Sequence, residues 1–281
     1  MKRRIETVLI GIMLLMALLK ANSQQLDSFQ NSIVTRQKLF MDSLQLNEKG
    51  HRHAQDGIYD VQVQNENNEK ILKVVAFGNS TTAYRKTIEQ VFAERLPGML
   101  MKAGLPAVVY NEGIPGSHTG RLGDNNRFKI PHALDRFEKV VLDRNPDIVT
   151  ICFGLNDSWF DQGKEAPRIA LNQYRSNLRY MIDELEKREV RIILMTPNAI
   201  GEKFEKWRYN YTAQYAEAMR GLANEYKLPL IDQWQLFEAY AAQKRNKIDD
   251  LMLDGMHPNN QWHAQWAALI ANEIVKIVNS Q

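Results

Sequence analysis

Five short apolar runs constrain the fold of this chain more than any other feature of its sequence. They are rich in Val and Ile and do not alternate with polar residues. Runs of this kind are typical of strands buried on both faces, as in a parallel sheet. The predicted strands are Ile71–Phe77, Ala107–Tyr110, Ile148–Phe153, Val190–Met195 and Leu228–Ile231.

Helical patterns separate these runs. The clearest spaces its apolar residues by threes and fours from Leu171 to Leu185, and the last one places Trp266, Ile270 and Ile277 on one side. Alternating strands and helices indicate an α/β chain with helices on both faces of the sheet. We therefore predict a three-layer α/β/α sandwich with a mostly parallel five-stranded sheet, formed by residues 70–281.

The first 23 residues have the layout of a secretory signal peptide. A basic segment (Lys2–Arg4) precedes 12 apolar residues (Val8–Leu19) and a small-residue cleavage site (Ala21–Ser23). The apolar stretch is shorter than the roughly 18 residues of a membrane-spanning helix. We expect a secreted or periplasmic protein with no stable membrane insertion after signal removal, and an uncleaved anchor is the alternative.

Charge and cysteine content narrow the classes of partner. Residues 1–23 hold four of the 36 basic and one of the 33 acidic residues, which leaves 32 of each in the mature chain. This balance predicts no attraction to nucleic acid. Cys152 is the only cysteine, so no internal disulfide can form. Because it lies within an apolar run, we expect it to be buried and inert.

Residues 24–69 stand apart from the strand–helix pattern. Residues 26–46 could form a helix, and "YDVQV" (59–63) alternates like an edge strand. The segment is too short for a separate sandwich domain, so we expect an N-terminal arm packed on the core. His51 and His53 could pair on a metal, but no second ligand cluster accompanies them. We therefore predict no metal and no cofactor.

Polar and glycine-rich segments follow the predicted strands. They are "GNS" after the first strand, "NEGIPGSHTGR" after the second, "GLND" after the third, and "LDGMHPNN" before the last helix. Ligands of an open parallel sheet gather just beyond the carboxyl ends of its strands. We therefore expect these four segments to converge on one site.

Three interpretations compete for Ser80. It could cap the helix expected to follow it, it could belong to a phosphate-binding loop at that helix start, or it could be a nucleophile. Asp254 and His257 favour the nucleophile. At a spacing of three, the carboxylate can hold one imidazole nitrogen and leave the other to accept a proton from a serine.

Gly116 and Asn156 suit the stabilisation of negative charge. Ester hydrolysis passes through a tetrahedral oxyanion, which must meet hydrogen-bond donors already in place. The backbone N–H of Gly116, the Asn156 amide and the backbone N–H of Ser80 at a helix start are candidates. The alternatives are a turn after Pro115 for Gly116 and an Asx turn for Asn156.

Together these residues resemble the SGNH (GDSL-type) hydrolase family, whose motifs occur here in order across residues 70–281. They are Ser80 in "GNS", Gly116 in "NEGIPG", Asn156 in "GLND", and Asp254 with His257 in "DGMH". The resemblance implies a flavodoxin-like fold and a serine esterase. Ser80 would be the nucleophile, His257 the base and Asp254 its orienting partner, with Gly116, Asn156 and the Ser80 amide as the oxyanion hole.

The chain departs from the family pattern at two places. Asn79 stands where the family usually has Asp. We expect Asn79 to adjust the loop that carries the nucleophile and to contact the substrate. Trp262-His263 stands where Gly-His is common, and we expect His263 to be a helix-start residue. The G-x-S-x-G elbow of α/β-hydrolases is absent, because Thr81 and Thr82 follow Ser80.

The predicted activity is hydrolysis of short acyl esters, acetyl above all, on carbohydrates, with a small-molecule or glycan ester as the partner. Trp159 and Phe160 could wall the acyl pocket or stack on a sugar, and His118 could reach the substrate. A lysophospholipase or acyl-thioesterase is the alternative among enzymes. A non-catalytic glycan-binding protein with a vestigial site is the alternative from another class, and the intact Ser80, Asp254 and His257 disfavour it.

Overall fold

The computed structural model describes residues 71–280 of the chain. The predicted signal peptide (1–23), the predicted arm (24–69) and His51 and His53 lie outside the described residues. The predictions made for them remain predictions.

A five-stranded parallel sheet forms the centre of the described chain. Its strands are β1 (Leu72–Gly78), β2 (Ala107–Gly113), β3 (Ile148–Cys152), β4 (Arg191–Met195) and β5 (Leu230–Ile231). They are ordered β2-β1-β3-β4-β5, and every adjacent pair is parallel. The predicted parallel sheet is therefore confirmed, with β3 at its centre and β1 between β2 and β3.

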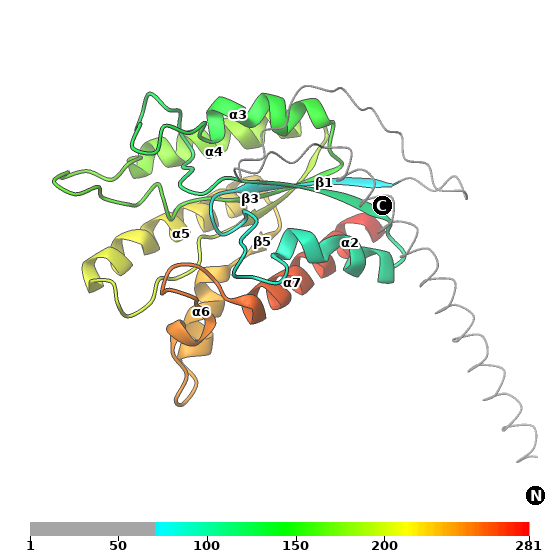
Figure 1. Cartoon of the computed structure of the whole chain (residues 1–281). Helices are drawn as coiled ribbons and strands as arrows, with labels where there is room; N and C mark the ends of the chain where they lie inside the picture. Colours follow the sequence, from blue (N-terminus) through cyan, green and yellow to red (C-terminus); the bar gives the residue numbers. More distant parts are fainter. Residues whose placement is uncertain (1–70, 281) are drawn as a thin grey trace, which may run out of the picture. The chain divides into compact units, whose positions relative to one another are not determined.

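Helices cover both faces of this sheet, as the α/β/α prediction requires. In Figure 1, α3 and α4 lie above the strands, and α2 and α7 lie below them. The first core joins one face of the sheet to α2, α6 and α7, and the second joins the other face mainly to α3, α4 and α5. The helices are α2 (Phe92–Lys102), α3 (Ala133–Val140), α4 (Leu171–Glu186), α5 (Lys206–Tyr226), α6 (Gln233–Ala241) and α7 (Asn260–Asn279), with 3₁₀ turns η1 (Leu142–Arg144) and η2 (Ile248–Leu251).

Strand β1 shows why its sequence lacks alternation. Val74 and Ala76 enter one core, whereas Val75 and Phe77 enter the other, and all four are fully buried. Successive side chains of a strand point to opposite faces, so both sets must be apolar when helices cover both faces. The central strands therefore bury nearly every residue.

Cys152 and His263 lie where the sequence predicts. Cys152 ends β3 and is almost wholly buried, and burial raises the pKa of its thiol to about 12, which keeps it protonated. His263 lies in the first turn of α7. Its Nδ1 accepts a hydrogen bond from the backbone N–H of Phe92 at 3.2 Å, so α7 caps the start of α2.

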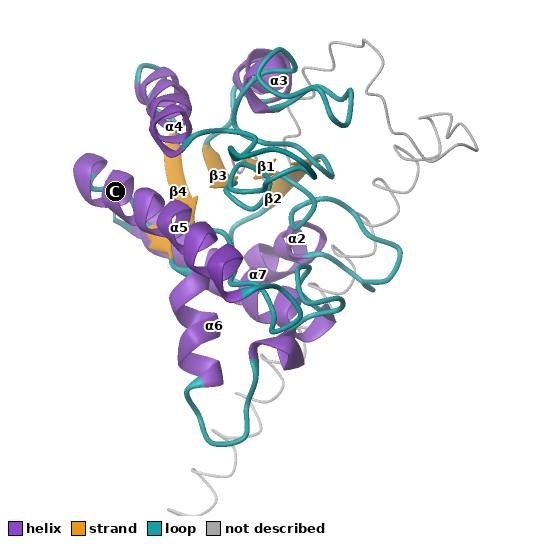
Figure 2. Cartoon of the chain, turned by 90° about the vertical axis from the view of Figure 1, so that its left-hand side faces the viewer, coloured by secondary structure: helices purple, strands orange, loops and turns teal. Residues whose placement is uncertain are grey.

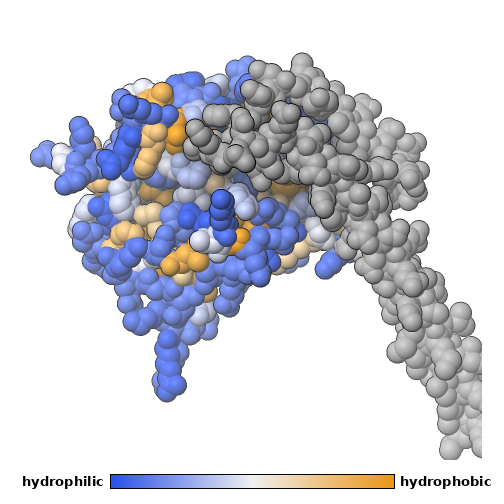
Figure 3. Space-filling view, viewed as in Figure 1, coloured by the Kyte–Doolittle hydropathy of each residue, from blue (hydrophilic) through white to orange (hydrophobic). Residues whose placement is uncertain are grey.

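The face of the described chain seen in Figure 3 is mainly hydrophilic, and apolar residues form small separate patches on it. Within residues 71–280, no helix combines the length and apolar character needed to cross a bilayer.

Candidate active site

The loops that carry the candidate residues begin side by side. Gly78 at the end of β1 pairs with Gly113 at the end of β2 and with Cys152 at the end of β3. Figure 2 faces this carboxyl edge, where loops gather in front of the strands. The segments that contain Ser80, Gly116 and Asn156 therefore start from the ends of three adjacent strands, β1, β2 and β3.

Ser80 lies in a tight turn, which corrects the expectation of a helix directly after it. The backbone N–H groups of Thr82 and Ala83 both donate to the carbonyl oxygen of Asn79, at 3.2 and 3.0 Å. The next helix, α2, begins only at Phe92. The helix-cap and phosphate-loop interpretations of Ser80 both need a helix start at this point, so the structure removes the basis for each.

Asn79 shapes this turn from within, and its predicted contact with substrate stays a prediction. Its side chain is almost fully buried. Its Oδ1 accepts hydrogen bonds from the backbone N–H and the hydroxyl of Thr81, both at 2.9 Å. These bonds use the side-chain oxygen to close an Asx turn, which agrees with the expectation of a tuned nucleophile loop.

Ser80, His257 and Asp254 form a continuous chain of hydrogen bonds. The Ser80 Oγ lies 3.0 Å from His257 Nε2, and His257 Nδ1 lies 2.8 Å from Asp254 Oδ2. Asp254 Oδ1 also accepts from the backbone N–H groups of Met256 and His257. A carboxylate that accepts from Nδ1–H leaves Nε2 unprotonated, which is the form that can accept the serine proton.

The electrostatics of this chain keep Asp254 charged and His257 neutral. Burial opposes ionisation of Asp254, but hydrogen bonds from His257 and two backbone amides outweigh it and lower its pKa to about 2. Burial lowers the pKa of His257 below its ordinary value, although its bond to Asp254 acts in the opposite direction. At neutral pH the imidazole is therefore available as a base.

We expect kcat/KM to fall on the acid side as His257 becomes protonated, about tenfold for each pH unit below its pKa. Since burial lowers this pKa, the fall should begin below the pH at which an ordinary histidine titrates. Initial rates on a nitrophenyl ester across pH measure it. Enzyme that is held at acid pH and then assayed at neutral pH controls for unfolding. A loss of kcat/KM that begins above the pH range in which an ordinary histidine titrates would contradict the assignment of His257 as the base.

Gly116 lies in a turn that only glycine accommodates well. The backbone N–H of Ser117 donates to the carbonyl oxygen of Ile114 at 3.1 Å, and Gly116 has a φ of +82°. With Pro115 before it, this arrangement fits a type II turn, whose third position needs positive φ. The turn uses the Ser117 N–H and leaves the Gly116 N–H outside it. The turn interpretation and the donor interpretation of Gly116 are therefore compatible.

Asn156 lies on the neighbouring loop, and its amide has a defined orientation. Its Oδ1 accepts a hydrogen bond from Arg168 Nη1 at 3.1 Å. The backbone N–H of Ser158, which an Asx turn would use, donates to the carbonyl oxygen of Gly154 instead, at 2.9 Å. Asp157, fully buried beside it, accepts from the backbone N–H groups of Gly154 and Thr119 and from the Thr119 hydroxyl, which fixes the loop on its neighbours. Sequence reasoning missed Arg168, because no local pattern connects it with Asn156.

Trp159 and Phe160 belong to a half-buried cluster of rings that joins this loop to the start of α5. Trp159 packs edge-on against Phe204 at 5.8 Å, and the Arg208 guanidinium lies 4.0 Å from the centre of its ring. Phe160 packs edge-on against Trp207 at 5.4 Å. Neither residue belongs to the two main cores, although Phe160 also packs edge-on against Tyr211, which lies against the second core.

His118 is turned into the protein, which gives no support to its predicted contact with substrate. The residue is fully buried and stacks on His132 with ring centres 3.4 Å apart. Its Nδ1 accepts from the backbone N–H of Gly120, and its Nε2 lies 3.3 Å from the carbonyl oxygen of Asn125. Both ring nitrogens are therefore engaged with backbone groups.

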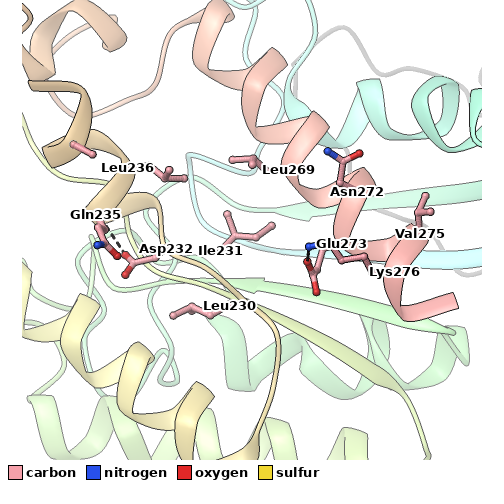
Figure 4. Close-up of a pocket in the computed structure, with 11 residues that line it drawn as sticks. Leu230, Ile231, Asp232, Gln235, Leu236, Leu269, Asn272, Glu273, Val275 and Lys276 are labelled. Carbon is pink, nitrogen blue, oxygen red and sulfur yellow. Dashed lines mark hydrogen bonds and ion pairs between the residues drawn. The ribbon is translucent and has the colours of Figure 1, made fainter. Parts of the chain in front are cut away.

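A separate groove of about 710 Å³ lies at the edge strand β5, between α6 and α7 (Figure 4). Its lining is mainly apolar, with Leu236 from α6 and Leu269 from α7 on opposite sides. None of the candidate catalytic residues lines it. Among the described residues, no group of three or more His, Cys, Asp or Glu side chains is arranged to hold a metal ion.

The chain is similar in sequence and in fold to proteins of known type. An arylesterase from Vibrio mimicus is 26% identical over 208 residues, which cover 73% of this chain and 88% of that protein. The crystal structure of a lipase/acylhydrolase from Enterococcus faecalis matches with a TM-score of 0.60 and 26% identity, over 73% of this chain and 96% of that one.

An acetylxylan esterase from Geobacillus stearothermophilus shares the fold, with a TM-score of 0.59 and 24% identity over 72% of this chain and 94% of that one. Residues 76–265 match the model of the GDSL-like lipase/acylhydrolase family, which covers most of the chain. The ordered motifs, the parallel sheet and this match agree. The chain therefore belongs to the GDSL-like lipase/acylhydrolase family, the SGNH hydrolases, and is an ester hydrolase.

Proposed function

We propose that this esterase is exported and removes acetyl or another short acyl group from carbohydrates, through an acyl-serine intermediate on Ser80. The observation that carries the mechanism is the hydrogen-bonded series from Ser80 Oγ through His257 to Asp254. Nucleophile and base lie within hydrogen-bond reach, and a third group orients the base, which is the arrangement that activates a serine.

In the proposed reaction, Ser80 Oγ attacks the ester carbonyl carbon while His257 Nε2 accepts the hydroxyl proton. The carbonyl oxygen becomes an oxyanion, which the N–H groups of Ser80 and Gly116 and the Asn156 amide stabilise. His257 then donates its proton to the departing alcohol oxygen, and the carbon–oxygen bond breaks. Water activated by His257 hydrolyses the acyl-serine and restores the free enzyme.

The tight turn after Asn79 supports the role of the Ser80 amide. Its hydrogen bonds use the N–H groups of Thr81, Thr82 and Ala83, so the Ser80 N–H stays outside this set. The Gly116 N–H is likewise outside its own turn. Donors that a loop does not consume can face a developing negative charge without any rearrangement.

The aromatic cluster supports a carbohydrate substrate with a short acyl group. Trp159 lies three residues after Asn156, and its ring is held by Phe204 and Arg208. Trp207, in the same cluster, has about half of its surface exposed (48%). Partly exposed rings on the loop that carries Asn156 can offer apolar faces to a sugar, and their bulk would leave little room for a long chain. The signal-like segment 1–23 supports export to where such glycans are found.

We expect kcat/KM for nitrophenyl acetate to exceed that for the octanoate by at least about tenfold, which is about 1.4 kcal/mol of transition-state discrimination. Each additional methylene must find space beside a bulky wall or force strain. A series of nitrophenyl esters of increasing length, followed by acetylated polysaccharides, measures it. Nitrophenyl esters are aryl esters, the class named for the Vibrio mimicus relative.

Replacing Trp159 with Ala should reduce the difference in kcat/KM between the acetate and the octanoate if the indole lines the acyl-binding site. Tyr180→Ala is the control, because it removes a partly exposed ring that packs on Phe137, outside this aromatic cluster. A preference of the unmodified enzyme for octanoate would contradict the short-acyl proposal and favour a lysophospholipase or thioesterase.

A further inference from the structure

The segment that follows Asn156 leaves the sheet edge and returns to the same place. Phe160 and Pro167 form an antiparallel bridge across it, and the backbone N–H of Arg168 donates to the carbonyl oxygen of Trp159 at 2.8 Å. This short ladder aligns the outgoing and returning strands of the segment. It brings the Arg168 side chain back beside Asn156, twelve residues earlier in the chain.

The contact between Arg168 and Asn156 fixes which way the amide faces. A guanidinium carries only donors, so only the Asn156 oxygen can face Arg168 Nη1, which lies 3.1 Å away. A flipped amide would place its NH₂ group against a guanidinium N–H and lose this bond. The amide Nδ2 is thereby directed away from Arg168.

Arg168 is itself held firmly. Its side chain is nearly buried, and its Nε and Nη2 donate to Asp161 Oδ1 at 3.1 and 2.8 Å. Asp161 also accepts from Asn125 Nδ2 at 3.2 Å and pairs with Arg127. A planar guanidinium bound at three of its nitrogens has little freedom to rotate.

Phe128 links this arrangement to the second candidate donor. The Arg168 guanidinium lies 4.7 Å from the centre of the Phe128 ring. A Cβ atom added to Gly116 would lie only 2.8 Å from Cδ2 of the same ring, so the ring packs directly on the Gly116 turn. One guanidinium thus hydrogen-bonds the loop of Asn156 and, through Phe128, supports the turn of Gly116.

We propose that Arg168, held by Asp161, is a positioning residue of the oxyanion hole, which orients the Asn156 amide toward the developing negative charge. This inference rests on the proposed function, in which Asn156 donates to the oxyanion. A donor held in place before the reaction needs no reorganisation at the transition state, where its contribution is largest. Arg168 acts through Asn156 and does not contact the reacting atoms.

A double-mutant cycle tests whether Arg168 acts through Asn156. We expect Arg168→Met to lower kcat about 10- to 100-fold, part of the roughly 10²–10³-fold loss expected of Asn156→Ala. KM on nitrophenyl acetate should change less than about twofold, because the effect arises in the transition state. In the Asn156→Ala background, Arg168→Met should lower kcat by no more than about twofold further.

The matched control is Arg127→Met, which removes another partner of the same Asp161 carboxylate without touching Asn156. Its kcat should stay within about twofold of the unmodified enzyme. A multiplicative loss in the double mutant would overturn the proposal, because it means that Arg168 acts independently of the amide. An equal loss in Arg127→Met would also overturn it, because changes around Asp161 would then lower kcat without any contact with Asn156.

Rescue of kcat by free guanidinium separates a positioning role of Arg168 from a purely structural one, because a purely structural role predicts no rescue. Adding guanidinium at non-denaturing concentrations to Arg168→Ala should raise kcat, and it should not do so in the Arg168→Ala, Asn156→Ala double mutant. Rescue of both variants would overturn the inference. An unchanged kcat in Asn156→Ala alone would remove the premise that Asn156 donates to the oxyanion, but it would not affect the Ser80 mechanism. Failure of the Arg168 inference can therefore be distinguished from failure of the proposed function.

Discussion

Ser80→Ala is expected to lower kcat by roughly 10⁴- to 10⁶-fold, the loss typical when the nucleophile of such a triad is removed. The variant loses one hydroxyl that bonds only His257 Nε2 among the hydrogen bonds described for it. The turn around Ser80 is held by Asn79 and the backbone, so the fold and the melting temperature should persist. Steady-state hydrolysis of nitrophenyl acetate and a thermal melt together measure the two effects.

A serine-reactive organophosphonate provides an independent check of the nucleophile. It should label Ser80 alone and fail to label Ser80→Ala. Ser158→Ala is a suitable control, because it removes the hydroxyl of a buried serine on the neighbouring loop, bonded to Leu155 and Thr212. Label found on any serine other than Ser80 would show that the nucleophile has been wrongly assigned.

Asp254→Asn should lower kcat by up to roughly 10⁴-fold with a much smaller effect on KM. The carboxylate accepts from His257 Nδ1 through one oxygen and from two backbone amides through the other. An asparagine that keeps the backbone bonds must turn its NH₂ group toward Nδ1. That group needs an acceptor, so it favours the tautomer with the proton on Nε2, which cannot take a proton from Ser80.

The comparison variant for this prediction is Asp250→Asn. Asp250 accepts from the backbone N–H of Lys247 at the start of η2 and does not bond His257. Its substitution should leave kcat within about twofold while changing the same charge. Small and equal losses at both positions would indicate that Asp254 has only a structural role in its loop.

The strands were predictable because the central ones are covered on both faces. In β1, β3 and β4 almost every side chain is buried, so burial appears in the sequence as an uninterrupted apolar run. Strand β2 extends three residues beyond its apolar run, through Asn111 and Glu112. It lies at the sheet edge, where side chains are only partly covered and polar residues are tolerated, so hydrophobicity does not mark its end.

The residues of the site could be predicted where the side chains that interact are close together in the sequence. Asp254 and His257 are three residues apart, so their pairing follows from the chain itself. The helix expected at Ser80 is absent, because the Asn79 side chain closes a turn there instead. His118 follows Gly116 closely in sequence, but the chain turns inward between them. Arg168 reaches Asn156 only through an irregular segment, which has no periodicity to interpret.

The proposed nucleophile and its base are separated by 177 positions in the chain. A ribosome therefore completes the serine loop long before it adds the aspartate and the histidine. Any nascent or truncated chain that stops before residue 254 carries the hydroxyl without the groups that would activate it. Packing of α7 against α2 follows later still, through the His263 contact with Phe92. Hydrolytic capacity should thus arise in a single late event, and unfinished copies should be harmless to the esters of the cell that makes them.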